Sequence, residues 1–215
     1  MKTVFTRIPR IWMSSRPIAA NARSRPTTRN ARQRVLEFFY STMQGGKSTA
    51  LLQRRFNLES IGRRVLVMTS ALDDRHGVGK VTSRMGPQCD ALLFQSDSEF
   101  RHQDFAEIDE LFIDEAQFLT ASQVKQIHQD LCAAHGMRVA CFGLRSDFQG
   151  NPFEGGACLL ALADQLHEIS TLCRCGRKAT MNQRVDAKGV AVRLGDVVEI
   201  GGDGRYRPVC APCFY

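Results

Sequence analysis

The 215-residue sequence contains no apolar run near the roughly 20 residues that a membrane-spanning helix requires. Near its start it also lacks the uninterrupted apolar stretch and small-residue cleavage site of a secretory signal. We therefore expect neither a membrane partner nor secretion. Hydrophobic residues make up 43% and charged residues 24% of the chain, which is typical of a globular protein with a sizeable core. The length fits one ordinary domain and a smaller one.

Acidic residues are absent from residues 1–34, which carry nine of the 29 Lys and Arg residues. The 20 basic residues that remain are outnumbered by 22 acidic ones, so the net charge of +7 belongs to this tail and no nucleic-acid partner is expected. A composition rich in Pro, Ser, Thr, Asn and Ala predicts a basic disordered extension, or a start site placed too far upstream. An arginine-rich, acid-free segment is also typical of an organelle transit peptide, so we expect a cytoplasmic location and leave organelle targeting open.

From Val35 onward, short apolar runs alternate with segments of helical period. The predicted strands are residues 36–40, 65–69, 111–113 and 139–142, and the predicted helices are residues 47–58, 122–134 and 158–167. Strands that alternate with helices predict an α/β fold, with a parallel sheet flanked by helices. We expect this nucleotide-binding domain to span residues 35–170. Residues 171–215, rich in Cys and Gly, are predicted to form a small second domain built of β-strands.

The first predicted strand is followed by S-T-M-Q-G-G-K-S, which opens a helix. Its last three residues match the phosphate-binding pattern G-x-x-x-x-G-K-[ST], although Ser41 replaces the first glycine. A strand, a tight turn and a helix N-terminus let backbone N–H groups bind phosphate, with Lys47 on the β and γ phosphates and Ser48 on Mg²⁺. The predicted ATP-binding residues of this loop are Ser41, Thr42, Met43, Gln44, Gly45, Gly46, Lys47 and Ser48.

A second apolar run, residues 111–113, ends in Asp114 and Glu115. An enzyme with a phosphate-binding loop needs an acidic residue at the end of a neighbouring strand to hold hydrated Mg²⁺. We expect Asp114 to address the metal through water. Glu115 points differently and is the candidate to accept a proton from an attacking hydroxyl group.

Four of the eight cysteines form two close pairs, Cys173-x-Cys175 and Cys210-x-x-Cys213. Two such pairs can bring four thiolates to one tetrahedral Zn²⁺ ion, and a site closed by four sulfur ligands is structural. Disulfide bonds are the alternative, but a nucleotide-binding enzyme belongs in a reducing compartment. The other four cysteines stand alone among apolar neighbours and are interpreted as buried thiols.

Several segments together resemble the zinc-containing, tetrameric type of thymidine kinase, in particular its bacterial members. The segments are F-Y-S-T-M-Q-G-G-K-S-T (residues 39–49), D-D-R (73–75), D-E-A-Q-F (114–118) and C-F-G-L-R-S-D-F-Q-G-N-P-F (141–153). The resemblance runs from about Leu36 to Cys213. It implies transfer of the γ-phosphate of ATP to the 5′-hydroxyl of thymidine, a homotetramer, and inhibition by the end-product triphosphate. In this family a serine commonly begins the phosphate-binding loop, and Ala or Ser is usual in place of Gly45.

The resemblance also implies roles for individual residues. Glu115 would be the general base on the 5′-hydroxyl. Further ATP- and Mg²⁺-binding residues would be Arg75, Asp114, Ala116 and Gln117. The thymidine pocket would be formed by Met43, Phe118, Phe148, Phe153 and Tyr206.

The four paired cysteines fall at zinc-ligand positions of this family. The residues between the pairs are predicted to form a hairpin, with strands at 197–200 and 205–209 around a glycine-rich turn. In the family this region is a lasso that closes over the nucleoside, so zinc would act on catalysis only by holding a lid.

Two other functions remain as alternatives. D-E-A-Q also resembles the Walker B box of nucleic-acid-stimulated ATPases, although the residues after Asp147 are too few for the second ATPase domain that helicases need. A zinc-ribbon module that binds nucleic acid would explain the tail and the cysteines but would leave Lys47 and Glu115 without a role. Two weaker signals are discounted: G-V-G-K at 77–80 is interpreted as a flexible loop, and residues 182–184 as a solvated positive face.

Overall fold

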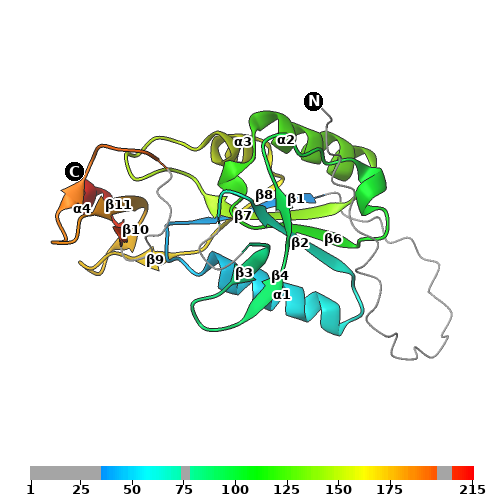
Figure 1. The fold of residues 1–215 in the computed structure, drawn as a ribbon, viewed down its shortest axis with the longest axis horizontal. Helices are drawn as coiled ribbons and strands as arrows, with labels where there is room; N and C mark the ends of the chain where they lie inside the picture. Colours follow the sequence, from blue (N-terminus) through cyan, green and yellow to red (C-terminus); the bar gives the residue numbers. More distant parts are fainter. Residues whose placement is uncertain (1–34, 74–77, 198–204) are drawn as a thin grey trace.

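A computed structural model describes residues 35–73, 78–197 and 205–215. Its centre is a parallel sheet with the strand order β5-β2-β6-β7-β1-β8 (Figure 1). The strands are β1 (Val35–Ser41), β2 (Val65–Ser70), β5 (Leu92–Phe94), β6 (Glu110–Ile113), β7 (Arg138–Leu144) and β8 (Gln165–Glu168). The strands predicted near residues 36, 65, 111 and 139 are therefore confirmed as β1, β2, β6 and β7.

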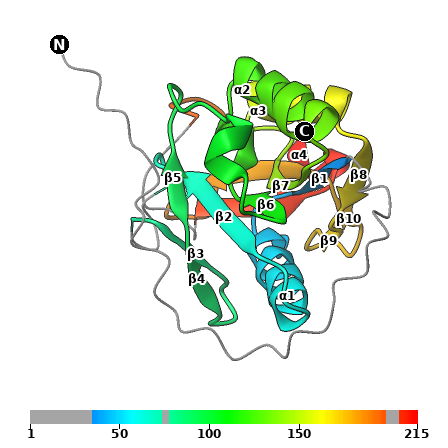
Figure 2. The same cartoon turned by 90° about the vertical axis from the view of Figure 1, so that its right-hand side faces the viewer.

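Helices cover both faces of this sheet (Figures 1 and 2). On one face lies α1 (Lys47–Ser60), and on the other lie α2 (Ala121–Gln126), its π-helical continuation (Ile127–Ala134) and α3 (Glu154–Leu162). Helix α2 begins with a capping box, in which Thr120 and Gln123 each bind the other's backbone N–H group. The arrangement confirms the predicted α/β class.

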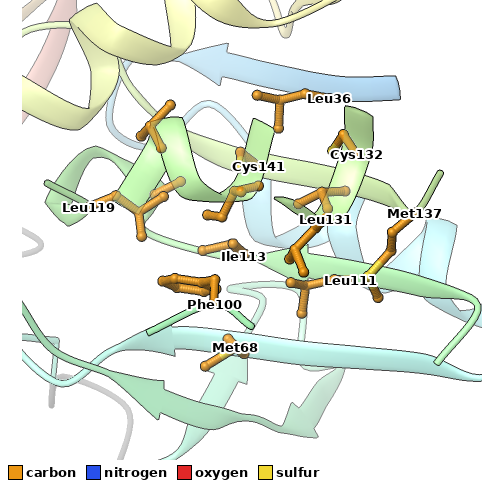
Figure 3. Packing of buried hydrophobic residues seen from close by; sticks show 14 of the residues in the cluster. Leu36, Met68, Phe100, Leu111, Ile113, Leu119, Leu131, Cys132, Met137 and Cys141 are labelled. Atoms are coloured by element: carbon orange, nitrogen blue, oxygen red, sulfur yellow. The ribbon is translucent and has the colours of Figure 1, made fainter. Parts of the chain in front are cut away.

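The core is divided between the two faces because successive side chains of a strand point in opposite directions. Leu111 and Ile113 of β6 pack with α2 and α3, in the larger cluster that Figure 3 shows. Phe112 points the other way and packs with Leu51 of α1. Burial on both faces explains why the central strands appear in the sequence as continuous apolar runs.

The predicted helix over residues 158–167 is wrong in its second half. Helix α3 begins earlier, at Glu154, and ends at Leu162, and β8 follows it as an edge strand beside β1. Asp164 lies between the end of α3 and the start of β8. Its backbone N–H donates to the carbonyl of Leu36 at 2.9 Å, and its carboxylate accepts from the Leu36 N–H at 2.7 Å. These bonds to β1 replace the next helical turn.

Several short elements were not predicted. Strands β3 (Lys80–Thr82) and β4 (Gln88–Asp90) form an antiparallel hairpin beside α1, and short 3₁₀ helices lie at His102–Phe105 and Ala116–Phe118. Lys80, which was expected in a flexible loop, begins β3, whereas Gly77 lies outside the described residues. Among the helices of the described residues, none is long and apolar enough to cross a membrane.

The described residues 171–197 and 205–215, called the C-terminal unit below, lie to one side of the sheet, at the left of Figure 1. Their elements are β9 (Thr171–Leu172), β10 (Lys178–Ala179), β11 (Met181–Val185), β12 (Ala191–Val192), β13 (Tyr206–Val209) and α4 (Ala211–Phe214). The predicted pairing of 205–209 with 197–200 is not observed: β13 pairs with β11, Val197 lies in no strand, and residues 198–204 lie outside the described ranges. Strand β11 takes the central place, between β12 and β13.

Candidate active site

A cavity of about 320 Å³ opens at the carboxyl ends of β1, β6 and β7. In parallel α/β sheets this edge is where ligands bind. The volume is at the lower end of the range for small-molecule sites. Its wall contains most of the predicted site residues: Met43, Gln44, Gly45, Gly46, Lys47, Ser48, Asp114, Glu115, Gln117, Phe118, Phe148, Phe153 and Tyr206.

Three predicted residues are not part of this wall, and a fourth cannot be placed. Ser41, Thr42 and Ala116 are buried and do not line the cavity. Thr42 contacts a site residue through its backbone, because its carbonyl accepts a hydrogen bond from Lys47 Nζ at 3.1 Å. Arg75 lies outside the described residues.

The phosphate-binding loop makes a tight turn between β1 and α1. Gly46 precedes the helix with φ = 80°, a left-handed conformation that favours glycine. Gln44 has φ = 63°, which is uncommon for a residue with a side chain. Lys47 stands at the first turn of α1, and its side chain is buried by the loop. The positive end of the helix and this ammonium group are therefore directed at the same small volume.

Gly45 permits a close approach within this loop. A Cβ atom at this position would overlap Ser41 Oγ and would lie 2.8 Å from Thr171 Oγ1. Ser41 Oγ donates to the carbonyl of Ile169 at 2.6 Å and lies 3.1 Å from Thr171 Oγ1. Glycine thus gives Ser41 room to bind the segment that leads into the C-terminal unit.

Asp114 lies next to Ser48, whose Oγ donates to Asp114 Oδ2 at 3.1 Å. The second carboxylate oxygen, Oδ1, is buried and has no hydrogen-bond partner within the described part of the chain. Burial, followed by repulsion from Glu115, raises the pKa of Asp114 to about 7, and Lys47 partly opposes this rise. A hydroxyl, a buried carboxylate and an unpartnered oxygen fit the needs of a hydrated divalent cation such as Mg²⁺.

Glu115 is held in place by its neighbour Gln117. Gln117 Nε2 donates to Glu115 Oε2 at 2.6 Å, and Gln117 Oε1 accepts from the backbone N–H of Leu144 at 3.0 Å. Glu115 itself has a left-handed backbone, with φ = 51° at the end of β6. Gln117 was predicted to bind nucleotide, whereas the structure shows both ends of its amide engaged with protein groups.

Aromatic side chains form the opposite part of the wall. Phe118 and Phe153 meet edge to face with ring centroids 5.8 Å apart, and Phe148 and Tyr206 do so at 6.4 Å. Arg184 lies over the Phe148 ring, 4.0 Å from its centroid. Aromatic rings that line the same cavity as the phosphate-binding loop are suited to a ring-bearing acceptor.

Two parts of the cavity wall were missed in the sequence. The first is the β3–β4 hairpin, which contributes Lys80, Ser83 and Arg84, with Ser83 Oγ 2.7 Å from Thr49 Oγ1 of α1. The only signal for it was a cluster of basic and hydroxyl residues after D-D-R. The second is Asn182, discussed below.

The segment from Asn182 to Arg184 was expected to form a solvated face, and that expectation is wrong. Asn182 and Arg184 are 3% and 7% exposed. The guanidinium of Arg184 donates to the carbonyls of Leu194 and Asp196, at 2.5 and 2.9 Å. No local pattern reveals this, because the partners lie in other segments.

The four paired cysteines converge in the C-terminal unit. Their Sγ atoms all lie within 4.8 Å of one another, and Cys175 and Cys210 Sγ are 3.5 Å apart. A hydrogen bond from Arg177 lowers the pKa of Cys175 to about 6, and backbone N–H groups of Cys175 and Cys210 lower the pKa of Cys173. All four are free thiols, so the disulfide alternative is not observed here. The cluster can hold a metal ion, and four sulfur ligands suit Zn²⁺.

Three of the four remaining cysteines are buried, as the sequence predicted. Cys89, Cys132 and Cys141 are buried, and Cys158 is half-buried. Burial raises the pKa of Cys132 to about 12, so this thiol stays protonated and unreactive at neutral pH.

Comparisons with known proteins match most of the chain to a single family. The sequence model of the thymidine kinase family matches residues 34–214. A thymidine kinase from Chromobacterium violaceum is 49% identical over 180 residues, which cover 84% of this chain and 97% of that protein. A thymidine kinase from Vibrio parahaemolyticus is 49% identical over 179 residues, 80% of this chain and 92% of that protein. A thymidine kinase from Albidiferax ferrireducens is 46% identical over 182 residues, which cover 84% of this chain and 91% of that protein. The chain, with its phosphate-binding loop, acidic pair and cysteine cluster, belongs to the thymidine kinase family.

Proposed function

We propose that the protein is a thymidine kinase, which transfers the γ-phosphoryl group of ATP to the 5′-hydroxyl of thymidine and releases ADP and dTMP. The observation that carries this proposal is that one cavity contains Lys47 of the phosphate-binding loop, the carboxylate of Glu115 and the aromatic pair Phe118 and Phe153. These three features would bind the phosphate donor, accept the proton and bind the nucleoside, in that order. Family membership supports the same reaction.

The loop holds the donor. Backbone N–H groups at the start of α1 and the Lys47 ammonium group bind the β and γ phosphates of ATP. Lys47 Nζ, which now donates to the carbonyl of Thr42, exchanges this bond for phosphate oxygens. Ser48 and Asp114 would hold Mg²⁺, which when bound would neutralise charge on the transferring phosphate.

Glu115 acts on the acceptor. One oxygen of its carboxylate accepts the proton of the 5′-hydroxyl while the oxygen of that hydroxyl bonds to the γ-phosphorus and the bond to ADP breaks. Gln117 keeps the second oxygen of Glu115 fixed through the 2.6 Å hydrogen bond. Phe118 and Phe153 bind the sugar and base, so the hydroxyl is presented in line with the γ-phosphate.

The four cysteines would hold a structural Zn²⁺ ion. Cys173 and Cys175 precede Tyr206 in the sequence and Cys210 and Cys213 follow it, so a bound ion would tie together the two segments that flank this cavity residue. The C-terminal unit, anchored in this way, would help to exclude water from the transfer. With four sulfur ligands, the ion would be structural and would take no part in the chemistry.

The proposal is tested by coupled ADP release from residues 35–215 with ATP, Mg²⁺ and thymidine, deoxyuridine, deoxycytidine, deoxyadenosine or single-stranded DNA as the acceptor. Turnover with thymidine is the expected result. Turnover that requires DNA would instead support the nucleic-acid-stimulated ATPase.

Three further expectations stay predictions. They are the homotetramer, the cytoplasmic location and inhibition by the end-product triphosphate. Size-exclusion chromatography with light scattering tests the first, and dTTP titration of the kinase assay tests the third.

A further inference from the structure

Two hydrogen bonds connect the phosphate-binding loop directly to the C-terminal unit. The backbone N–H of Met43 donates to Asn182 Oδ1 of β11 at 2.7 Å, although the two residues are 139 positions apart. Gln44 Nε2 donates to the carbonyl of Tyr206 in β13 at 2.7 Å. In Figure 1 the C-terminal unit lies beside the turn between β1 and α1, where these bonds form.

Asn182 makes a second bond, to the loop that follows β7. Its Nδ2 donates to the carbonyl of Ser146 at 2.9 Å, and the side chain is almost fully buried. The amide therefore satisfies one backbone donor, in the phosphate-binding loop, and one backbone acceptor, in the loop that follows β7. A carboxamide supplies this pair, because it has an acceptor at one end and donors at the other.

The bond from Met43 also determines how the loop can bind phosphate. Since the Met43 N–H is engaged by Asn182, phosphate contacts must come from the N–H groups that follow it. Gln44, the next residue, is in the left-handed region without being glycine, a conformation that persists only where surrounding contacts hold it. Asn182 and Tyr206 supply such contacts to Met43 and Gln44, the two residues that lead into Gly45 and the helix.

We propose that Asn182 is a positioning residue for the phosphate donor: it fixes the Met43 N–H against the Ser146 carbonyl and so makes ATP affinity depend on the C-terminal unit. This unit then serves both halves of the cavity, the nucleoside side through Tyr206 and the phosphate side through Asn182. The inference rests on the proposed function only in that the loop binds the phosphates of ATP.

The test replaces Asn182 by Leu, which has a similar volume and neither hydrogen-bonding group. Asn182→Ser is the second variant, for the case in which the leucine protein does not fold. The control is Gln183→Leu on the same strand, where the side chain is more exposed and reaches the Cys213 carbonyl at 3.3 Å. Three quantities are measured without any nucleoside: the Kd for Mg·ATP by calorimetry, hydrogen exchange of individual segments, and zinc content.

We expect Asn182→Leu to raise the Kd for ATP about tenfold, the scale of one buried hydrogen bond. Hydrogen exchange should become faster in residues 41–48 and 144–148 only. Zinc content should equal that of the wild type, and Gln183→Leu should change none of the three. Unchanged ATP affinity and loop exchange in either variant of Asn182 would overturn the proposal. So would a loss of ATP affinity accompanied by zinc loss and faster exchange throughout the C-terminal unit, because Asn182 would then only stabilise the fold.

Failure of the proposed function gives a different result. A wild-type protein that binds ATP but does not phosphorylate thymidine would contradict the proposed acceptor and leave the effect of Asn182 on ATP intact. A wild-type protein that binds no ATP would overturn the phosphate-loop assignment and this inference together.

Discussion

Gln117→Leu separates the positioning of Glu115 from its chemistry. The substitution keeps the volume of the side chain but removes two hydrogen bonds, at 2.6 Å to Glu115 Oε2 and at 3.0 Å from the Leu144 N–H. A hydrogen bond to a charged group contributes about 1.5–3 kcal/mol, which corresponds to roughly 10- to 100-fold in a rate. We therefore expect kcat for thymidine phosphorylation to fall by about that factor. The KM values for ATP and thymidine should change less than about threefold, because Gln117 faces protein groups on both sides.

The assay is steady-state ADP release at saturating ATP and thymidine, with the thermal midpoint of each variant measured in parallel. The control is Gln126→Leu on α2, which also removes a glutamine whose amide accepts from a backbone N–H, that of Phe100 at 2.9 Å, and neither residue lines the cavity. Both variants should lose about 1–3 kcal/mol of stability, but only Gln117→Leu should lose turnover. A folded Gln117→Leu protein with the kcat of the wild type would refute the argument that this amide orients the base.

Three further predictions concern the metal sites and the loop. The pKa of Asp114 is raised to about 7 in the folded protein, from an ordinary value of 3.8. Without added Mg²⁺, the contribution of Asp114 to stability should therefore be largest below about pH 4 and should decline up to about pH 7. In urea unfolding, Asp114→Asn should lack this decline. An equal pH dependence of stability in both proteins would contradict the prediction. Cys175→Ser should lower the zinc content and raise the KM for thymidine, whereas Cys158→Ser should leave both as in the wild type. Mass spectrometry measures the zinc content, and steady-state kinetics measures KM. Full zinc content in Cys175→Ser would contradict the ligand assignment. Gly45→Ala should force Ser41 away from Ile169 and lower the stability measured by thermal unfolding by about 1 kcal/mol. The double variant Gly45→Ala/Ser41→Ala should lose less stability than the sum of the two single variants. Strict additivity would show that the two sites do not interact.

The sequence predicted the layers of this protein well, because its signals are local. Strands buried on both faces appear as apolar runs, and the loop from Ser41 to Ser48 lies directly between β1 and α1. Asp114 and Glu115 follow β6, so their place at the carboxyl edge of the sheet follows from strand order alone. The cysteine pairs were predictable for the same reason, since each pair is close in sequence.

What could not be predicted depends on contacts between distant segments. The edge strand β8 is exposed, so its pattern does not differ from that of a helix, and only the bonds between Asp164 and Leu36 reveal its pairing. Asn182 looked like a solvated residue beside arginines because its partners, Met43 and Ser146, lie far away along the chain. The structural reason for Gly45 was hidden in the same way, in the side-chain position of Ser41.

The measurement that tests the central claim most directly is the kcat of Glu115→Gln for ATP-dependent phosphorylation of thymidine, with dTMP identified as the product. The variant keeps the shape of the side chain and removes its negative charge and its ability to accept a proton. The account predicts dTMP formation by the wild type, a fall in kcat of about 10²-fold or more in Glu115→Gln, and no change in the control Glu107→Gln, whose side chain is 75% exposed. A Glu115→Gln protein with unchanged kcat would contradict the role of Glu115, and a wild-type protein that forms no dTMP would contradict the proposed reaction.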